Sequence, residues 1–250
     1  MKTLQEILAG YHPISLEQVQ IADLMSRVEV KYTFNKSQLT QILEELIDDY
    51  RVLTVNKNTV NPYETIYFDT PTYSLYYQHH NSIFNRFKIR QRRYVSSGDS
   101  FLEIKFRNNK NRVIKERITT DSLKDYIGED GLNLINTKTS IDSSQLKPTL
   151  WVYFDRITLV NSNFSERITI DTNLSFRYDD KVVSYPNIAI AEVKQEIHFR
   201  STFIQLMKKS IIRDVSNSKY CIGLASVNEN IKKNNFKHKL MSLQKLSSEN

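Results

Sequence analysis

Residues 86–92, with the sequence RFKIRQR, carry a basic side chain at every second position. Successive side chains of a β-strand point to opposite faces, so this alternation places Arg86, Lys88, Arg90 and Arg92 on one face. Phe87 and Ile89 fall on the other. The period therefore predicts a strand with one fully cationic face and one apolar face.

The next two segments repeat this alternation. Residues 101–107 read FLEIKFR and residues 113–118 read VIKERI. The connections between the three segments are short and polar, as turns between antiparallel strands are. We therefore expect a three-stranded meander that gathers one set of charges on one sheet surface. The later strands contribute Glu103, Lys105, Lys115 and Arg117 to that surface.

The positive charge of the chain is concentrated in this meander. Residues 86–117 hold eleven of the 35 Lys and Arg residues and three of the 28 Asp and Glu residues, while the formal net charge of the whole chain is +7. The remainder is therefore close to neutral. An ordinary solvated sheet face is the alternative reading, but like charges opposite one another destabilise a sheet, and such a face would intersperse acids. A concentrated cationic face predicts a polyanionic partner.

Composition excludes several classes of protein. The 250 residues are 40% hydrophobic and include one cysteine, Cys221, so an intrachain disulfide framework and a cysteine-based zinc site are excluded. No apolar run approaches the roughly 20 residues of a membrane-spanning helix. The first residues carry polar and acidic side chains where a signal peptide needs an apolar stretch. We expect a cytoplasmic protein with one domain over residues 1–230, a helical lead-in over 1–25 and a flexible tail over 231–250.

Alternation elsewhere predicts about eight antiparallel strands with peripheral helices, an α+β fold. The further strands are expected at residues 27–32, 65–69, 149–157, 166–171 and 189–196, and the helices at 4–24, 37–47, 73–81, 122–136, 199–212 and 219–232. The charged faces of these strands bear Arg27, Glu29, Lys31, Arg156, Arg167, Glu192 and Lys194. If the sheet closes into a barrel, all these charges line one lumen and the helices cover the apolar outer face.

An ordered set of motifs resembles a known family. The set is RxExKY from Arg27, YFDTP from Tyr67, RxKxRxRxY from Arg86, LEIK from Leu102, KxR from Lys115, RITID from Arg167, EVK from Glu192 and SKY from Ser218. Over residues 15–225 it is similar to the VTC domain, the catalytic domain of the vacuolar transporter chaperone polyphosphate polymerase, in its bacterial form. That domain belongs to the triphosphate tunnel metalloenzymes.

The resemblance implies a basic tunnel that binds a triphosphate or polyphosphate, with Mn²⁺ or Mg²⁺ at one side. Its implied catalytic residues are Arg90, Arg92, Lys105, Arg156, Arg167 and Lys219. The further phosphate-binding residues are Lys31, Arg86, Lys88, Lys115, Arg117 and Lys194. Glu192 matches the family's metal-binding glutamate, and Glu29 or Glu103 would complete the site because hard oxygen donors suit these metals.

One departure bears on the reaction. Hydrolytic members of the superfamily begin with ExExK, and here Arg27 replaces the first glutamate, which favours the polymerase branch. The resemblance then implies transfer of the terminal phosphoryl group of ATP to a polyphosphate chain, with a separately encoded membrane protein as a possible partner. A triphosphatase acting on inorganic, nucleoside or thiamine triphosphate and a non-catalytic polyphosphate binder remain alternatives. We do not expect nucleic acid as the partner, since the basic residues face inward.

Overall fold

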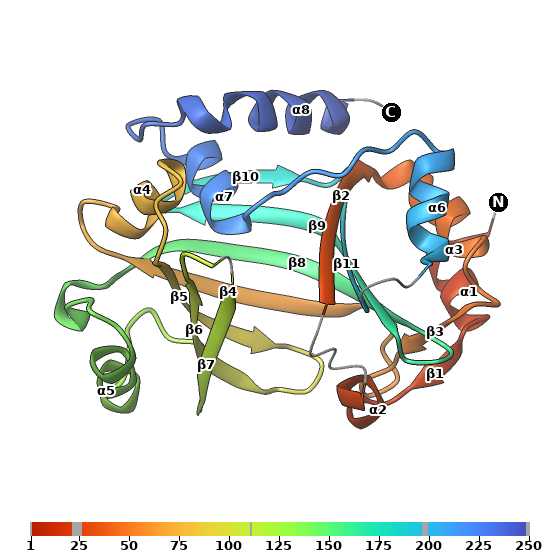
Figure 1. Cartoon of the computed structure of the whole chain (residues 1–250), viewed down its shortest axis with the longest axis horizontal. Helices are drawn as coiled ribbons and strands as arrows, with labels where there is room; N and C mark the ends of the chain where they lie inside the picture. The colour runs from red at the N-terminus through yellow and green to blue at the C-terminus, as the bar shows by residue number, and fades with distance from the viewer. Residues whose placement is uncertain (1, 22–26, 111, 197–199, 249–250) are drawn as a thin grey trace.

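The computed structural model describes residues 2–21, 27–110, 112–196 and 200–248. Its main feature is one sheet in which eight strands lie in the order β2-β11-β9-β8-β4-β5-β6-β7, each antiparallel to its neighbour (Figure 1). Those strands are β2 (Arg27–Asn35), β4 (Asn61–Asp69), β5 (Arg86–Tyr94), β6 (Ser100–Arg107), β7 (Val113–Thr120), β8 (Lys147–Asn161), β9 (Glu166–Tyr178) and β11 (Ile188–Glu196). The expected antiparallel sheet with helices is confirmed.

Three short strands were not predicted from the sequence. They are β1 (His12–Ile14), β3 (Tyr50–Leu53) and β10 (Lys181–Tyr185). The first two pair with each other in parallel, and β10 extends the edge of β9. Segments of three to five residues are too short to show a period, so alternation cannot identify them.

The sheet curls strongly, but the closed barrel that we expected is not confirmed in the part of the chain that the structure describes. Within it, the sheet has eleven strands and no hydrogen bonds join β2 to β7. The outer edge of β2 instead meets residues 214 and 215, where the Val215 amide donates to the Lys31 carbonyl at 2.7 Å. The curl still brings β2 close enough to β6 for the charges of Glu29 and Lys105 to shift each other's pKa.

Helices cover the outer face of the sheet, as expected. α1 (Leu4–Ala9), α3 (Leu39–Glu44) and α6 (Thr202–Lys209) share one hydrophobic core with β2, β9 and β11, and Figure 1 shows them grouped at one end of the molecule. α5 (Glu129–Lys138) covers β4, β5 and β6 through Ile135. Shorter helical segments are α2 (Leu16–Ile21), α4 (Ser74–His80) and the 3-10 turns η1 (Lys36–Gln38), η2 (Ser143–Gln145) and η3 (Asn234–Phe236).

One helix packs on the inner face instead. α7 (Lys219–Val227) lies against β8 and β9, where Leu150, Phe154 and Phe176 are buried in the same core as the helix. Phe154 and Arg156 are two residues apart on β8 and so share a face. The inner face is therefore apolar where α7 fills it and charged beyond the start of that helix.

Much of the segment 231–250, where we expected a flexible tail, forms a helix in the residues described there. α8 (Lys237–Ser248) lies across the top of the molecule in Figure 1, and Ile231, Phe236 and Leu243 are buried. The side chain of Asn35 donates to the Leu246 carbonyl at 3.0 Å. The Lys- and Ser-rich composition did not predict this helix, because only a few apolar residues of the segment face the core.

The seating of α7 generates a first prediction. A Cβ atom added at Gly223 would lie 2.3 Å from the Phe176 ring and 2.8 Å from Leu150. We expect Gly223→Ala to lower the free energy of unfolding by about 1–3 kcal/mol, because overpacking displaces the helix from the sheet. Gly128→Ala is the matched control, since nothing lies within 4 Å of its Cβ position. Urea titration measures both, and equal stability of the two variants would contradict this packing.

Candidate functional site

The inner face of the curled sheet gathers the cations that the sequence predicted. At its centre, Lys88 on β5, Lys105 on β6 and Lys115 on β7 lie directly opposite one another in the strand register. In the described part of the chain, Lys88 and Lys105 form no ion pair with a carboxylate, and the Lys88 ammonium donates to Ser218 Oγ at 2.9 Å. Like charges in this arrangement destabilise a sheet. We refer to these three residues as the lysine row.

Electrostatics within the lysine row are unfavourable for the protein alone. Burial and the neighbouring Lys88 lower the pKa of Lys105 to about 7. Burial also lowers the pKa of Lys88. Both ammonium groups lose solvation and form no ion pair with a carboxylate in the described residues, and the charge of Glu29 offsets only part of this cost at Lys105. A bound anion would supply further opposite charge.

Arginines flank the lysine row. Arg90 is held by Glu103, with Nε–Oε2 and Nη2–Oε2 distances of 2.6 Å, and it also donates to the Tyr67 hydroxyl at 3.2 Å. Burial opposes ionisation of Glu103, but Arg90 and Arg92 lower its pKa to about 2. Arg117 lies opposite Glu103 in the register, and its guanidinium stacks 4.7 Å from the Phe101 ring centroid. Glu103 therefore fixes Arg90 in place.

Arg92 is buried without a carboxylate partner among the described residues. Its Nε donates to Thr65 Oγ1 at 3.1 Å, and the guanidinium lies 5.5 Å and 5.6 Å from the ring centroids of Tyr63 and Phe154. Burial lowers its pKa. Aromatic rings offset part of the cost of a buried cation, but they leave its hydrogen-bond donors available to a ligand.

A third group joins β8, β9 and α7. Asp171 accepts two hydrogen bonds from Arg156, at 2.6 and 2.8 Å, and one from Lys219 Nζ at 2.5 Å. Burial would raise the pKa of Asp171, but these two cations lower it to about 2. Lys219 is the first residue of α7, and the Ser218 side chain caps that helix. The site thus depends on where α7 begins.

The start of α7 is held by a buried carboxylate. Asp69 accepts hydrogen bonds from the amides of Leu75 and Tyr76, both at 2.9 Å, and from the Tyr220 hydroxyl. It therefore ties β4, α4 and α7 together. Because Ser218 and Lys219 precede Tyr220 directly, this anchor positions the Lys88 and Asp171 contacts as well.

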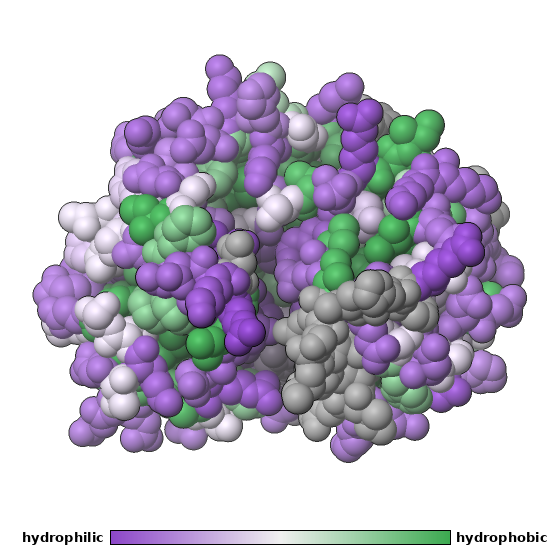
Figure 2. All heavy atoms as spheres, viewed as in Figure 1, coloured by the Kyte–Doolittle hydropathy of each residue, from purple (hydrophilic) through white to green (hydrophobic). Residues whose placement is uncertain are grey.

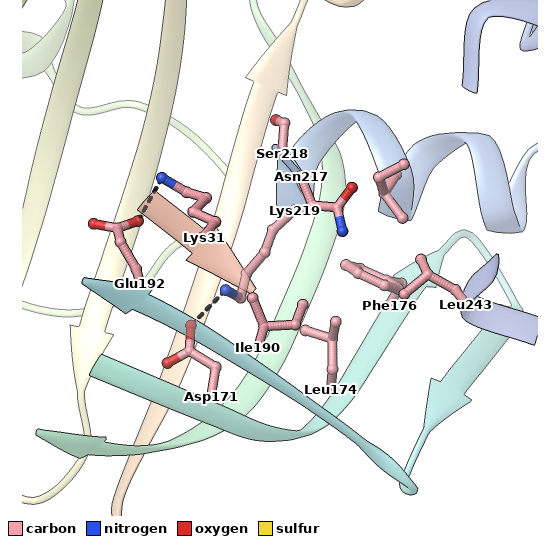
Figure 3. A pocket seen from close by; sticks show the side chains of 11 residues that line it. Lys31, Asp171, Leu174, Phe176, Ile190, Glu192, Asn217, Ser218, Lys219 and Leu243 are labelled. Atoms are coloured by element: carbon pink, nitrogen blue, oxygen red, sulfur yellow. Dashed lines mark hydrogen bonds and ion pairs between the residues drawn. The ribbon is translucent and has the colours of Figure 1, made fainter. Parts of the chain in front are cut away.

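Two glutamates meet on the opposite wall. Lys31 Nζ binds Glu192 at 2.8 Å and also contacts Glu29, while Lys194 Nζ binds Glu192 at 2.5 Å. Burial would raise the pKa of Glu192, but Lys194 and Lys31 hold it well below the usual range. Figure 3 shows the Lys31–Glu192 and Lys219–Asp171 pairs facing one pocket. Glu103 is not part of this group.

The donor chemistry of Glu29 and Glu192 fits a divalent metal. No group of three potential metal-binding side chains occurs in the described residues. Mg²⁺, however, usually takes one or two carboxylates together with water and substrate phosphate oxygens. The two carboxylates converge on one ammonium group, that of Lys31, and so already hold a cation between them. They would hold Mn²⁺ or Mg²⁺ when a phosphate ligand supplies the remaining oxygens.

The other predicted residues lie on or beside the same face. Arg167 lies opposite Lys194 in the register, and Lys194 lies opposite Glu29. Arg86 lies at the edge, where its Nη1 donates to the Ile83 carbonyl at 2.7 Å. The side chain of Arg27 lies outside the described residues.

Asp171 is the functional residue that sequence reasoning missed. It stands four positions after Arg167 on β9, so alternation places both on one face. That signal was present in the sequence, but it could not show that one carboxylate serves both Arg156 and Lys219. The two cations are 63 positions apart in the chain.

A curled antiparallel sheet with a cationic interior defines this chain as a tunnel-fold protein. The model of the VTC domain matches residues 26–228, and the chain therefore belongs to the VTC-domain family. No protein of curated function matches the sequence.

Solved structures of low sequence identity are similar to this chain. One, from Hippeastrum, is described as a candidate adenylyl cyclase with a dominant triphosphatase activity; it is 14% identical, with 82% of this chain and 98% of that chain covered and a TM-score of 0.53. A candidate adenylate cyclase from Vibrio parahaemolyticus is 13% identical, with 79% and 97% covered and a TM-score of 0.48. The similarity to the Hippeastrum structure is evidence for the fold of this chain and not for its activity.

In the portion that the structure describes, none of the helices combines the length and apolar character that crossing a membrane requires.

The lysine row generates a second prediction. Because the pKa of Lys105 falls from 10.5 to about 7 on folding, the unfolded chain binds more protons between these values, and stability should rise with pH across that window. At pH 6, Lys105 is charged in both the folded and the unfolded state, and the folded state then carries the full free-energy cost of burying this charge beside Lys88. Lys105→Met should therefore raise the urea midpoint at pH 6 and lose much of this advantage at pH 9.

The exposed Lys110 offers the matched control, Lys110→Met. Its urea midpoint should match that of the wild type at both pH values. A Lys105→Met variant that is less stable than the wild type at pH 6 would contradict the unfavourable lysine row.

Proposed function

We propose that this protein is a polyphosphate polymerase-like phosphotransferase that passes the terminal phosphoryl group of ATP to a phosphate or polyphosphate chain. The observation that carries this proposal is the position of Lys88 and Lys105, opposite each other on an inner face and without carboxylate partners in the described residues. A polyphosphate repeats its negative charge along its length, and so matches a row of cations that continues across neighbouring strands.

The chemistry of such a transfer depends on positioning and charge neutralisation. Arg90 and Lys219 are fixed by Glu103 and Asp171, and Arg92 is enclosed by aromatic rings, so all three are preorganised. Preorganised cations stabilise the charge that develops on the transferring group. The acceptor is itself an anion, and no general base is required. A divalent metal held by Glu29 and Glu192 would neutralise additional phosphate charge.

Two alternatives use the same site. The triphosphatase activity described for the Hippeastrum protein makes hydrolysis of a triphosphate the second candidate. The replacement of the first ExExK glutamate by Arg27 supports transfer over hydrolysis. Tight polyphosphate binding without turnover is the third candidate. Nucleic acid is disfavoured, because the basic residues line an interior.

The proposed function also bears on the cellular compartment in which the protein acts and on a partner protein. ATP as donor supports a cytoplasmic site of action. If the product is to leave the cytoplasm, a separately encoded membrane protein would have to accept the growing chain.

A third prediction tests the proposed reaction. With ATP and Mn²⁺, the wild type should produce polymers that a gel resolves by length. Arg92→Ala should lower kcat/KM by about 100-fold or more, as loss of a preorganised transition-state contact does. Arg93→Ala is the matched control on the same strand, because Arg93 is exposed and its Nη1 lies 3.8 Å from Glu64.

The products distinguish the candidates. Release of orthophosphate without chain growth would replace the transferase with a triphosphatase. Polyphosphate binding without any turnover would identify a binding protein. Equal loss of activity in Arg92→Ala and Arg93→Ala would contradict the assigned inner face.

A further inference from the structure

A second pocket lies at the far end of β4 from α7. It is lined by Asn61, Pro62 and Tyr63 of β4, by Tyr94 at the end of β5, and by neighbouring loop and helix residues. α7 contacts the other end of that strand, where Tyr220 stacks on Tyr67 with ring centroids 5.0 Å apart. The remaining lining residues are Leu16, Leu53, Val55, Ser96 and Ser97.

Asn61 gives this pocket an unusual polar group. The residue is 5% exposed, and neither its Nδ2 nor its Oδ1 has a hydrogen-bond partner among the described residues. Buried polar atoms without partners destabilise a fold, and native proteins contain few of them. The Asn61 side chain lines the pocket and carries one donor and one acceptor that no described residue satisfies.

Aromatic rings form the adjacent wall. Tyr63 and Tyr94 meet edge to face, with ring centroids 4.8 Å apart. Tyr63 also contacts the cationic interior, because the guanidinium groups of Arg156 and Arg92 lie 4.9 and 5.5 Å from its ring centroid. The Tyr63 ring therefore both lines the pocket and contacts two cations of the inner face.

The alternation of β4 aligns the pocket with these cations. Asn61, Tyr63, Thr65 and Tyr67 share the inner face, and a strand rises about 3.3 Å per residue. Thr65 accepts from Arg92, and the Tyr67 hydroxyl accepts from Arg90. From Asn61, the first of these contacts is therefore roughly 13 Å along the strand and the second roughly 20 Å. A nucleoside triphosphate lying along β4 has comparable length.

We propose that the pocket formed by Asn61, Tyr63 and Tyr94 binds the adenine ring of the nucleotide donor. This inference rests on the proposed function, since it assigns the base of the triphosphate whose phosphates lie in the cationic interior. An asparagine amide matches the N6 donor and N7 acceptor of adenine, whereas guanine presents two acceptors at that edge. The half-buried ring of Tyr94 provides a surface on which a base can stack.

Calorimetric titration in EDTA tests this pocket without turnover. The probes are ATP, GTP and inorganic tripolyphosphate, which lacks a base. Wild-type protein should bind ATP about tenfold more tightly than GTP. Asn61→Ala should weaken ATP binding by about tenfold, abolish the preference over GTP, and change tripolyphosphate affinity by less than twofold. Asn133→Ala, at an exposed position of α5, should match the wild type with all three probes.

A second variant guards against a failure of Asn61→Ala to fold. Tyr94→Leu should weaken ATP and GTP binding together, because stacking does not depend on the base, and should leave tripolyphosphate binding unchanged. Equal weakening of ATP and tripolyphosphate in Asn61→Ala, or no weakening of either, would overturn the adenine pocket.

The outcomes separate this inference from the proposed function. Polymer synthesis by a wild-type protein that binds ATP and GTP equally would retain the transferase and reject the adenine pocket. Asn61-dependent ATP binding by a protein without phosphoryl transfer would retain the pocket and reject the transferase.

Discussion

The unfavourable interaction among like charges on the inner face is the constraint on which the rest of the structure depends. Lys88, Lys105 and Lys115 lie opposite one another in the strand register. Repulsion between these like charges and the burial of Lys88 and Lys105 both disfavour the charged ammonium, and the pKa of each of these two residues is lowered. Carboxylates are present nearby, but Glu103, Asp171 and Glu192 engage flanking cations. The sheet therefore neutralises the flanking cations but forms no ion pair with Lys88 or Lys105 in the described residues. An anionic ligand would supply opposite charge at these two residues.

The fold keeps this arrangement stable through its apolar contacts. Helices bury the outer face of the sheet, and α7 fills the apolar part of the inner face, so the charged interior adjoins a well-packed core. The same helix contributes Lys219 and Ser218 to the site, and Asp69 fixes its start through Tyr220. The helix α7 therefore contributes both to the packing of the core and to the proposed ligand site. Displacement of α7 would disturb both.

Much of this arrangement could be predicted from alternation alone. The period of two in residues 86–92 identified the strand, its inner face and its cations, and the same reasoning found seven other strands. Contacts between distant segments could not be predicted in this way. The shared use of Asp171 by Arg156 and Lys219, the packing of α7 inside the curl and the unpartnered amide of Asn61 depend on the tertiary fold. The contact of the outer edge of β2 with residues 214 and 215 could not be predicted either, because these two residues carry no strand period.

The pKa of Lys105 tests the central claim most directly. Side-chain NMR of lysine Cε across a pH titration would follow this group in the free protein and with saturating inorganic tripolyphosphate, and Lys105→Met would assign its resonance. The account predicts a pKa of about 7 in the free protein and a rise of at least one unit when the anion binds, because the ligand supplies the missing opposite charge. An ordinary lysine pKa in the free protein, or a value that the anion leaves unchanged, would contradict it.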